Sequence, residues 1–136
     1  MIDLEIFRQM GSISRRATKE MNQAASQYQL ENNLFLYLIS IVEHEGLTQS
    51  DLSDLIQVDK TTLSRALAKL DRRGYIDKVA DAKNKNYKQL YPTQKARDNY
   101  QVLAALVKQY INDRLSALSE SELKQLNQLL AKILHT

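Results

Sequence analysis

Residues 47–95 read LTQSDLSDLIQVDKTTLSRALAKLDRRGYIDKVADAKNKNYKQLYPTQK, and this stretch decides the fold. Two short helical patterns meet at a tight turn at Gln57-Val58. Two short strand-like segments follow, at about 75–79 and 87–91, with the polar loop ADAKNKN between them. This order predicts a helix-turn-helix followed by a β-hairpin wing, an arrangement that places one helix in the DNA major groove.

Capping and packing residues support the two short helices. Thr48 and Asp59 are suited to be their N-caps, because a side-chain oxygen there accepts a backbone N–H that the first turn leaves unpaired. Gly74 is expected to end the second helix. The residues expected to be buried are Leu52, Leu55 and Ile56 in the first helix and Leu63, Ala66, Leu67 and Leu70 in the second.

Helical periodicity also predicts helices on both sides of this stretch. They span about 2–28, 31–45 and 94–117, and a Ser119–Glu122 capping box begins a last one. The helix at 31–45 is apolar around most of its circumference and should be buried, with Gly46 as its C′ residue. We therefore expect one mainly α domain of the α+β winged-helix class with about six helices, spanning 1–136, with a DNA-binding lobe at 47–92, a wing at 80–87, and dimerisation helices at 1–30 and 94–136.

Composition excludes several classes of function. The 136 residues are 43% hydrophobic and 26% charged, which is ordinary for a globular domain, and no apolar run has the length of a membrane span. Neither a signal peptide nor a cysteine is present, so we expect a cytoplasmic protein without disulfides or thiolate-bound metal. With two distant histidines and three scattered glycines, we predict no metal site, no cofactor and no enzymatic activity.

The charge is distributed unevenly along the chain. The net charge is only +3, but residues 59–88 hold nine Lys and Arg against four acidic residues, which leaves the remainder at −2. A basic segment on a mildly acidic body is typical of nucleic-acid binding.

The second short helix carries the residues expected to read bases. Small, hydrogen-bonding side chains near its N-terminus suit the major groove, and these are Thr61, Thr62, Ser64 and Arg65. Arg65 is the expected base contact, because a guanidinium bonds guanine O6 and N7 together. The alternative is an ordinary exposed helix face, although such a face would favour better helix formers.

Other residues are expected to contact the DNA backbone. Thr48, Gln49 and Ser50 lie at a helix N-terminus, which attracts anions, although Thr48 is a cap in either case. The remaining candidates are basic: Lys60, Lys69, Arg72 and Arg73 along the second helix, and Lys83, Lys85 and Lys88 in the wing. A wing typically lays such a residue beside the minor groove.

The terminal helices point to a homodimer. Three helices with apolar stripes flank one small winged unit, which cannot cover all of them. We interpret the excess as a two-fold interface that matches two recognition helices to two half-sites. The alternative is an intramolecular bundle.

These residues resemble the MarR family of bacterial transcriptional regulators over essentially the whole chain. In the most specific part, LTQSDLSDLIQVDKTTLSRALAKLDRRGYI is similar to the family's pattern L-T-x-x-E-L-A … v-d-x-s-t-v-T-R-x-l-x-x-L-e-x-r-G-l-I. The segment Pro92 to Ala96 resembles the family's L-T-x-x-G, with alanine in place of glycine. The wing tip departs from the family's Asp-Arg-Arg: Asn84-Lys85-Asn86 lacks the forked guanidinium, so we expect it to contribute affinity more than sequence choice.

The resemblance implies a winged-helix homodimer that usually represses by occupying promoter DNA and releases it when a small, often aromatic or phenolic, ligand binds. The implied ligand site lies between the dimerisation helices and the DNA-binding lobe. By position, five residues would line it: Phe7, Met10, Tyr37, Ile41 and Tyr100. Ordinary core packing is the alternative for each. The absence of cysteine excludes the family's peroxide-sensing branch.

The leading prediction is therefore a sequence-specific regulator that binds double-stranded DNA, in the form of a repressor that a ligand releases. The alternative is a winged-helix module whose basic face binds an acidic protein, without sequence-specific DNA binding. An enzyme or a small-molecule carrier comes third, because no nucleophile has a base beside it in the sequence.

Overall fold

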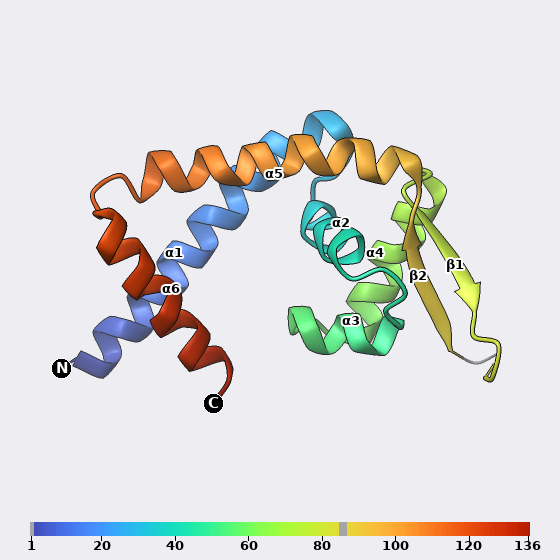
Figure 1. Ribbon diagram of the computed structural model, residues 1–136, viewed down its shortest axis with the longest axis horizontal. Coiled ribbons are helices and arrows are strands. Elements are labelled where there is room, and N and C mark those ends of the chain that lie inside the picture. Colours follow the sequence, from blue (N-terminus) through green and yellow to red (C-terminus); the bar gives the residue numbers. More distant parts are fainter. Residues whose placement is uncertain (1, 85–86) are drawn as a thin grey trace.

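The computed structural model describes residues 2–84 and 87–136, which form six α-helices, one short 3₁₀ helix and a β-hairpin (Figure 1). The elements are α1 (Ile2–Ala25), η1 (Ser26–Tyr28), α2 (Leu34–Glu43), α3 (Gln49–Ile56), α4 (Lys60–Arg72), β1 (Ile76–Ala80), β2 (Lys88–Pro92), α5 (Gln94–Arg114) and α6 (Glu120–Leu134). The predicted fold class, a mainly α winged helix, is confirmed. Among the described residues, no helix is both long and apolar enough to cross a lipid bilayer.

The helix-turn-helix consists of α3 and α4, and local bonds fix the turn between them. Gln57 adopts a left-handed conformation with φ of 61°, and the Val58 N–H donates to the Ser53 carbonyl at 3.2 Å. The Ser53 hydroxyl, which is buried, returns a bond to the Val58 carbonyl at 2.5 Å. The turn that the sequence predicted at Gln57-Val58 is thus present, and both polar groups of Val58 are paired inside the lobe.

The hairpin is tied to the start of α3. Its antiparallel register runs from Ile76 opposite Pro92 to Ala80 opposite Lys88. An isolated bridge joins Thr48 to Gln89, and the Leu90 N–H donates to the Leu47 carbonyl at 2.8 Å. Residues 47–48 thereby join the start of α3 to β2 beside the two-stranded sheet.

The core lies where α2, α4, the hairpin and α5 meet, and α2 is at its centre as predicted (Figure 1). All four apolar residues predicted to be buried in α4 are buried. The prediction for Leu55 was wrong, because its side chain is 52% exposed. In the short α3 the inward stripe follows the i, i+4 pair Leu52 and Ile56, and Leu55 is turned away from that stripe.

Three element boundaries differ from the predicted ones for local reasons. α2 begins at Leu34, later than predicted, because Asn33 is left-handed and its N–H donates to the Asn22 side chain at 2.8 Å. α2 ends at Glu43 with His44 as its C-cap, so Gly46 lies one position beyond C′, with φ of 90°. β1 begins after Tyr75, because the Tyr75 N–H still donates to the last turn of α4.

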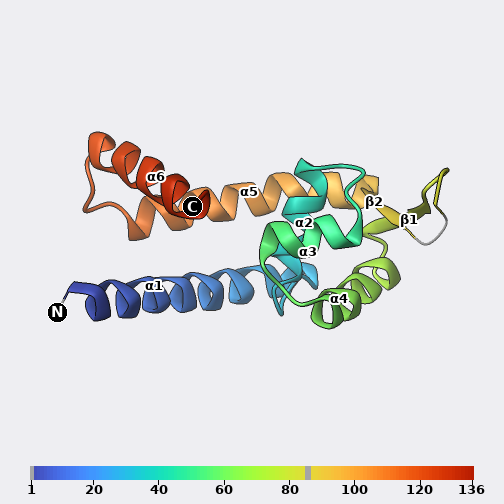
Figure 2. The same cartoon turned by 90° about the horizontal axis from the view of Figure 1, so that it is seen from below.

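The two ends of the chain form arms that extend away from the lobe. α5 spans the molecule, while α1 and α6 diverge from each other at the end remote from the hairpin (Figures 1 and 2). No residue of α6 is buried, and Ile133 and Leu134 are 58% and 79% exposed. In the first half of α1, Phe7 is 73% exposed. Within one chain, these apolar stripes therefore have no core to cover them.

Candidate nucleic-acid interface

The start of α3, the start of α4 and the hairpin enclose one recess of about 390 Å³. It unites six residues predicted from separate parts of the sequence: Thr48, Gln49, Ser50, Lys60, Ser64 and Lys88. Lys78 and Tyr87 also line it and were not predicted. The two-residue alternation along a strand would have identified Lys78, because it places this side chain on the same face as the buried Ile76. The recess is therefore polar, with three lysines and two hydroxyl-bearing helix starts.

The first turn of α3 is built by a capping box. The Asp51 N–H donates to the Thr48 Oγ1 at 3.1 Å, and the Thr48 N–H donates to the Asp51 carboxylate at 3.4 Å. Thr48 is thus the predicted cap. The N-terminus of α3 opens on the recess, where the helix dipole and the unpaired N–H groups of a first turn attract an anion.

Asp59 fixes the first turn of α4. Its Oδ1 accepts the Thr62 backbone N–H and its Oδ2 accepts the Thr62 hydroxyl, both at 2.8 Å. These bonds, first the backbone one and then the hydroxyl, hold the pKa of the Asp59 carboxyl below its usual range, so the cap remains ionised at neutral pH. Because the Thr62 hydroxyl already donates to Asp59, this residue serves the cap as well as the exposed face on which it was predicted.

The exposed face of α4 is a crest between two recesses. Thr61, Arg65 and Arg72 follow one another at helical spacing along the crest and are all exposed. On one side, Lys60 and Ser64 face the wing. On the other side, a hollow of about 220 Å³ lies between α4 and α2, lined by Asn32, Leu34, Tyr37, Thr62, Arg65, Ala66 and Lys69. This crest is the part of the lobe that is free to enter a groove.

Arg73 does not belong to this face, although the sequence grouped it with the other basic residues. Its guanidinium Nη1 donates to the Gln29 carbonyl at 2.6 Å and lies 3.4 Å from the Glu31 carboxylate. The helix has ended by this residue, so its side chain turns back toward the junction between α1 and α2. We therefore leave Arg73 out of the proposed interface.

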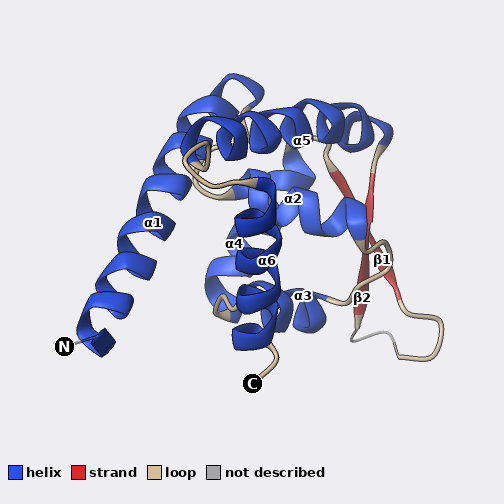
Figure 3. Cartoon of the chain, turned by 60° about the vertical axis from the view of Figure 1, so that its left-hand side comes forward, coloured by secondary structure: helices blue, strands red, loops and turns tan. Residues whose placement is uncertain are grey.

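The wing projects from the lobe at the far end of the hairpin (Figure 3). The Tyr87 N–H donates to the Asn84 carbonyl at 3.0 Å, and the Asp81 N–H donates to the Tyr87 carbonyl at 2.9 Å. Lys83 in the loop and Lys88 in β2 are exposed, as a backbone contact requires. Lys85, the other predicted wing contact, and Asn86 lie outside the described residues.

The five residues proposed to line a ligand crevice do not share a cavity in one chain. Phe7 and Met10 are 73% and 47% exposed on the α1 arm, while Ile41 is fully buried in the core. Tyr37 lines the hollow beside α4, and its pKa is raised chiefly by burial. The Tyr100 hydroxyl donates to the Glu43 carboxylate at 2.7 Å, which raises the pKa of this tyrosine. Within one chain these residues are thus spread over the arm, the core and the lobe, and the predicted ligand site stays a prediction.

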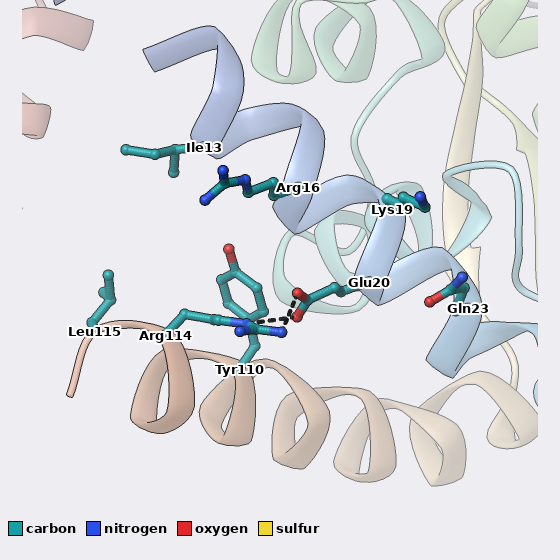
Figure 4. A pocket seen from close by; sticks show the side chains of 8 residues that line it. All are labelled: Ile13, Arg16, Lys19, Glu20, Gln23, Tyr110, Arg114 and Leu115. Carbon is teal, nitrogen blue, oxygen red and sulfur yellow. Dashed lines mark hydrogen bonds and ion pairs between the residues drawn. The ribbon is translucent and has the colours of Figure 1, made fainter. Parts of the chain in front are cut away.

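A different cavity, of about 660 Å³, lies between α1 and α5 (Figure 4). Ile13, Tyr110 and Leu115 give it an apolar side, and Arg16, Lys19, Glu20, Gln23 and Arg114 give it a polar one. The Arg114 Nε donates to Glu20 at 3.1 Å across the cavity, and this bond raises the pKa of the guanidinium. The helical periodicity marked Ile13 and Tyr110 only as apolar stripe residues and so did not reveal this site.

The chemistry of these sites is that of binding. Among residues 2–84 and 87–136, no three His, Asp or Glu side chains gather in a position to hold a metal ion. The face of α3, α4 and the hairpin offers ammonium, guanidinium and hydroxyl groups, which bind phosphate oxygens and base edges.

Comparison with known proteins gives a consistent result. The sequence model of the MarR family matches residues 28–85. The uncharacterized HTH-type transcriptional regulator YybA of Bacillus subtilis is 33% identical over 129 residues, covering 95% of this chain and 86% of that protein. A MarR family transcriptional regulator from Listeria monocytogenes, solved in complex with a 26-mer DNA, has a TM-score of 0.91 at 30% identity, covering 95% of this chain and 86% of the other. For the S. aureus MepR–DNA complex the TM-score is 0.81 at 26% identity, with coverage of 96% and 94%.

Proposed function

Because this chain belongs to the MarR family of DNA-binding transcriptional regulators, we propose that it is a repressor that binds a pseudo-palindromic operator as a homodimer and is released by a small ligand. The observation that carries the proposal is the single face on which the start of α3, the crest of α4 and the hairpin meet. Action on DNA places the protein in the cytoplasm.

Each part of this face has its own role in the proposal. The crest of α4 enters the major groove, where Arg65 bonds a base edge. The N-terminus of α3 and the lysines of the recess bind phosphates, which sets the register of the helix on the duplex. Lys83 of the wing lies beside the minor groove and adds affinity. Lys85 is outside the described residues, and its role stays the one expected from the sequence.

The exposed surface of the chain supports the homodimer. It amounts to 9835 Å² for a mass of 15.7 kDa. A compact monomer of that mass exposes about 7,300 Å², so the excess is roughly 2,500 Å². Stable homodimers bury on the order of 2,000–5,000 Å² in total, which the excess on two chains can supply.

Much of this excess surface is apolar and lies on the two arms, α1 and α6. Exposed apolar residues follow α1 and α6 at helical spacing, among them Ile6, Met10 and Ile13 in α1 and Leu130, Ile133 and Leu134 in α6. Monomeric proteins rarely leave such continuous apolar stripes in water. In the proposed dimer, the arms of two chains cover each other, and a two-fold axis presents two α4 helices to two half-sites.

The cavity between α1 and α5 supports the ligand response. Its volume of about 660 Å³ suits a small molecule, and its lining combines apolar residues with Arg16 and Lys19, while Arg114 is paired with Glu20. That combination fits an aromatic ring with a phenolate or carboxylate. A ligand that prefers a dimer with displaced α4 helices shifts the population away from the DNA-competent state, and a shift from 99:1 to 1:99 requires about 10⁴-fold differential affinity.

Thermal-shift screening with phenols and aromatic carboxylates tests this part of the proposal. A binder is expected to raise the melting temperature and to release operator DNA at the same concentrations. Arg16→Gln should weaken such an anionic ligand, whereas Arg8→Gln, an exposed site on α1 outside the cavity, should not. A ligand that binds without releasing DNA would contradict the regulatory role.

Electrophoretic mobility shift with genomic fragments tests the function itself. The protein is expected to retain a few fragments that share a pseudo-palindrome, with half-sites one or two turns of about 10–10.5 base pairs apart. The opposing candidate is a winged-helix module that binds an acidic protein. The absence of any shifted fragment at low salt would favour that candidate.

Arg65→Ala is expected to weaken binding to the preferred operator by about 1–3 kcal/mol for each half-site and to relax the choice of one base pair in each, because the variant cannot form the bidentate bond to the base. Lys83→Ala removes a charge that faces the DNA backbone in each subunit and should weaken all sequences alike, lowering the salt slope by about 1.8, or 0.9 for each subunit. Selection from a randomised operator library measures both effects. If the two variants select the same sequences with the same loss of affinity, the assigned roles are incorrect.

A further inference from the structure

The three residues that follow α4, Arg73 to Tyr75, fasten this helix to the junction between α1 and α2. The Tyr75 hydroxyl donates to the Tyr28 carbonyl at 2.6 Å, and the Arg73 Nη1 donates to the Gln29 carbonyl at the same distance. Glu31 lies 3.4 Å from that guanidinium. The two carbonyls belong to the last residue of η1 and to its C-cap, where no further helical turn supplies a donor.

The same three residues are held from the other side by the start of α5. The Arg73 carbonyl accepts from the Lys95 Nζ at 2.7 Å, and the Gly74 carbonyl accepts from the Thr93 hydroxyl at 2.7 Å. The Tyr75 carbonyl accepts from the Thr93 N–H at 3.0 Å. Lys95 also lies 4.4 Å from the centre of the Tyr75 ring, a cation–π distance. We call this set, Arg73 to Tyr75 with Thr93 and Lys95, the clasp.

The junction that the clasp grips is itself fixed. Gln29 and Asn33 are left-handed, with φ of 60° and 66°. The Asn22 side chain accepts the Asn33 N–H at 2.8 Å and donates to the Asn33 side chain at 3.0 Å. The carbonyls of Tyr28 and Gln29 are therefore presented to α4 in one orientation. Tyr75 is 2% exposed, so its hydroxyl has little access to water as a substitute partner.

We propose that Arg73 and Tyr75 are positioning residues, which set the angle of the recognition helix α4 against the arms α1 and α5 and thereby the separation of the two α4 helices in the dimer. The inference rests on the proposed homodimer that binds DNA. It assigns Arg73 to protein geometry and Arg72, its exposed neighbour on the crest, to the DNA.

A small change at the clasp matters because the spacing of the two half-sites along the DNA duplex is fixed. Half-sites lie about 34–36 Å apart for each helical turn between them, and one added base pair displaces a half-site by about 3.4 Å. A dimer with a fixed α4 separation must deform DNA of the wrong spacing, while a dimer with loosened α4 helices adapts to it.

The first test uses no DNA. The chain has no cysteine, so Thr61→Cys introduces a single spin label on the exposed crest of each α4. In the wild-type background, a single narrow distribution of distances between the two labels is expected. Arg73→Gln or Tyr75→Phe should broaden it at least twofold, and Arg72→Gln, the matched control, should leave it unchanged. Unchanged widths in both clasp variants, or no distance in the wild-type background, would overturn the proposal.

The second test measures affinity for operators whose half-sites are brought one base pair closer or moved one apart. The wild-type protein is expected to lose about tenfold, a typical cost of deforming the duplex, and the clasp variants only about threefold. Arg73→Gln should keep the wild-type salt slope, whereas Arg72→Gln should lower it by about 1.8, or 0.9 for each subunit. A reduced salt slope for Arg73→Gln would mean that Arg73 contacts a DNA phosphate, and this result would overturn the proposal. If no DNA binds but the label distances respond as expected, the proposed function fails and the clasp stands.

Discussion

Raising the monovalent salt concentration from 50 to 200 mM is expected to weaken operator binding by about 10³–10⁵. The proposed dimer presents each basic side chain of the face twice, and contacts with 6–10 phosphates release counterions in proportion. The exposed or recess-lining cations on each chain that supply these contacts are Lys60, Lys69, Arg72, Lys78, Lys83 and Lys88. Fluorescence anisotropy of a labelled operator over a salt series measures the slope.

A matched pair of variants locates the source of the slope. Lys60→Gln removes a charge from the recess between α4 and the wing, and should lower the slope by about 0.9 for each phosphate that is no longer neutralised. Lys108→Gln removes the same charge from an exposed site on α5 that does not line that recess, and should leave the slope unchanged. A slope near zero, or one that responds equally to both variants, would contradict the assigned face.

Leu130→Glu combined with Ile133→Glu is expected to separate the dimer and to reduce operator affinity by about 10²–10⁴, the gain that two linked binding units give over one. Both side chains lie on α6, 46% and 58% exposed in a single chain. In the proposed dimer they would be covered, and four carboxylates would have to be desolvated. Sedimentation velocity measures the mass, and anisotropy the affinity.

The control for this prediction is on the same helix. Gln125→Glu with Gln128→Glu adds the same charge to exposed polar positions of α6, so the dimer should persist. Circular dichroism should show the lobe still folded in both double variants, because no residue of α6 is buried in the chain. A wild-type protein that sediments as a single subunit, or a Leu130 and Ile133 variant that stays dimeric, would refute the proposed interface.

Local chemistry made most of the fold predictable. Thr48, Asp59 and Ser119 are N-caps in the structure, each accepting the N–H three residues ahead, because capping depends on neighbours along the chain. The helical stripe of α4 and the order of helices and strands were also correct. Capping and periodicity act over a few residues, so the sequence alone contains them.

Leu55 and the element boundaries differ from the predictions for local reasons, and the larger differences concern contacts between distant segments. Arg73 looked like another basic residue of the recognition helix, but its partner Gln29 lies 44 residues earlier. Phe7 and Met10 were placed near the lobe by helix order alone, and nothing in their periodicity indicates where α1 is directed. Six of the predicted DNA contacts do come together in the recess between α3, α4 and the hairpin, because they all come from the helix-turn-helix and wing, whose relative placement is set by the motif. Their contact with DNA stays a prediction.

The exposed C-terminal helix has a consequence for how the protein behaves at low abundance. A helix of 15 residues of which none is fully buried in its own chain is only marginally stable in water. In the proposed assembly, its order is supplied by a second molecule and follows mass action. The number of copies in the cell would then determine how many promoters are occupied and also what fraction of each polypeptide is structured. Dilution would therefore abolish operator binding by this regulator before its DNA-binding lobe unfolds.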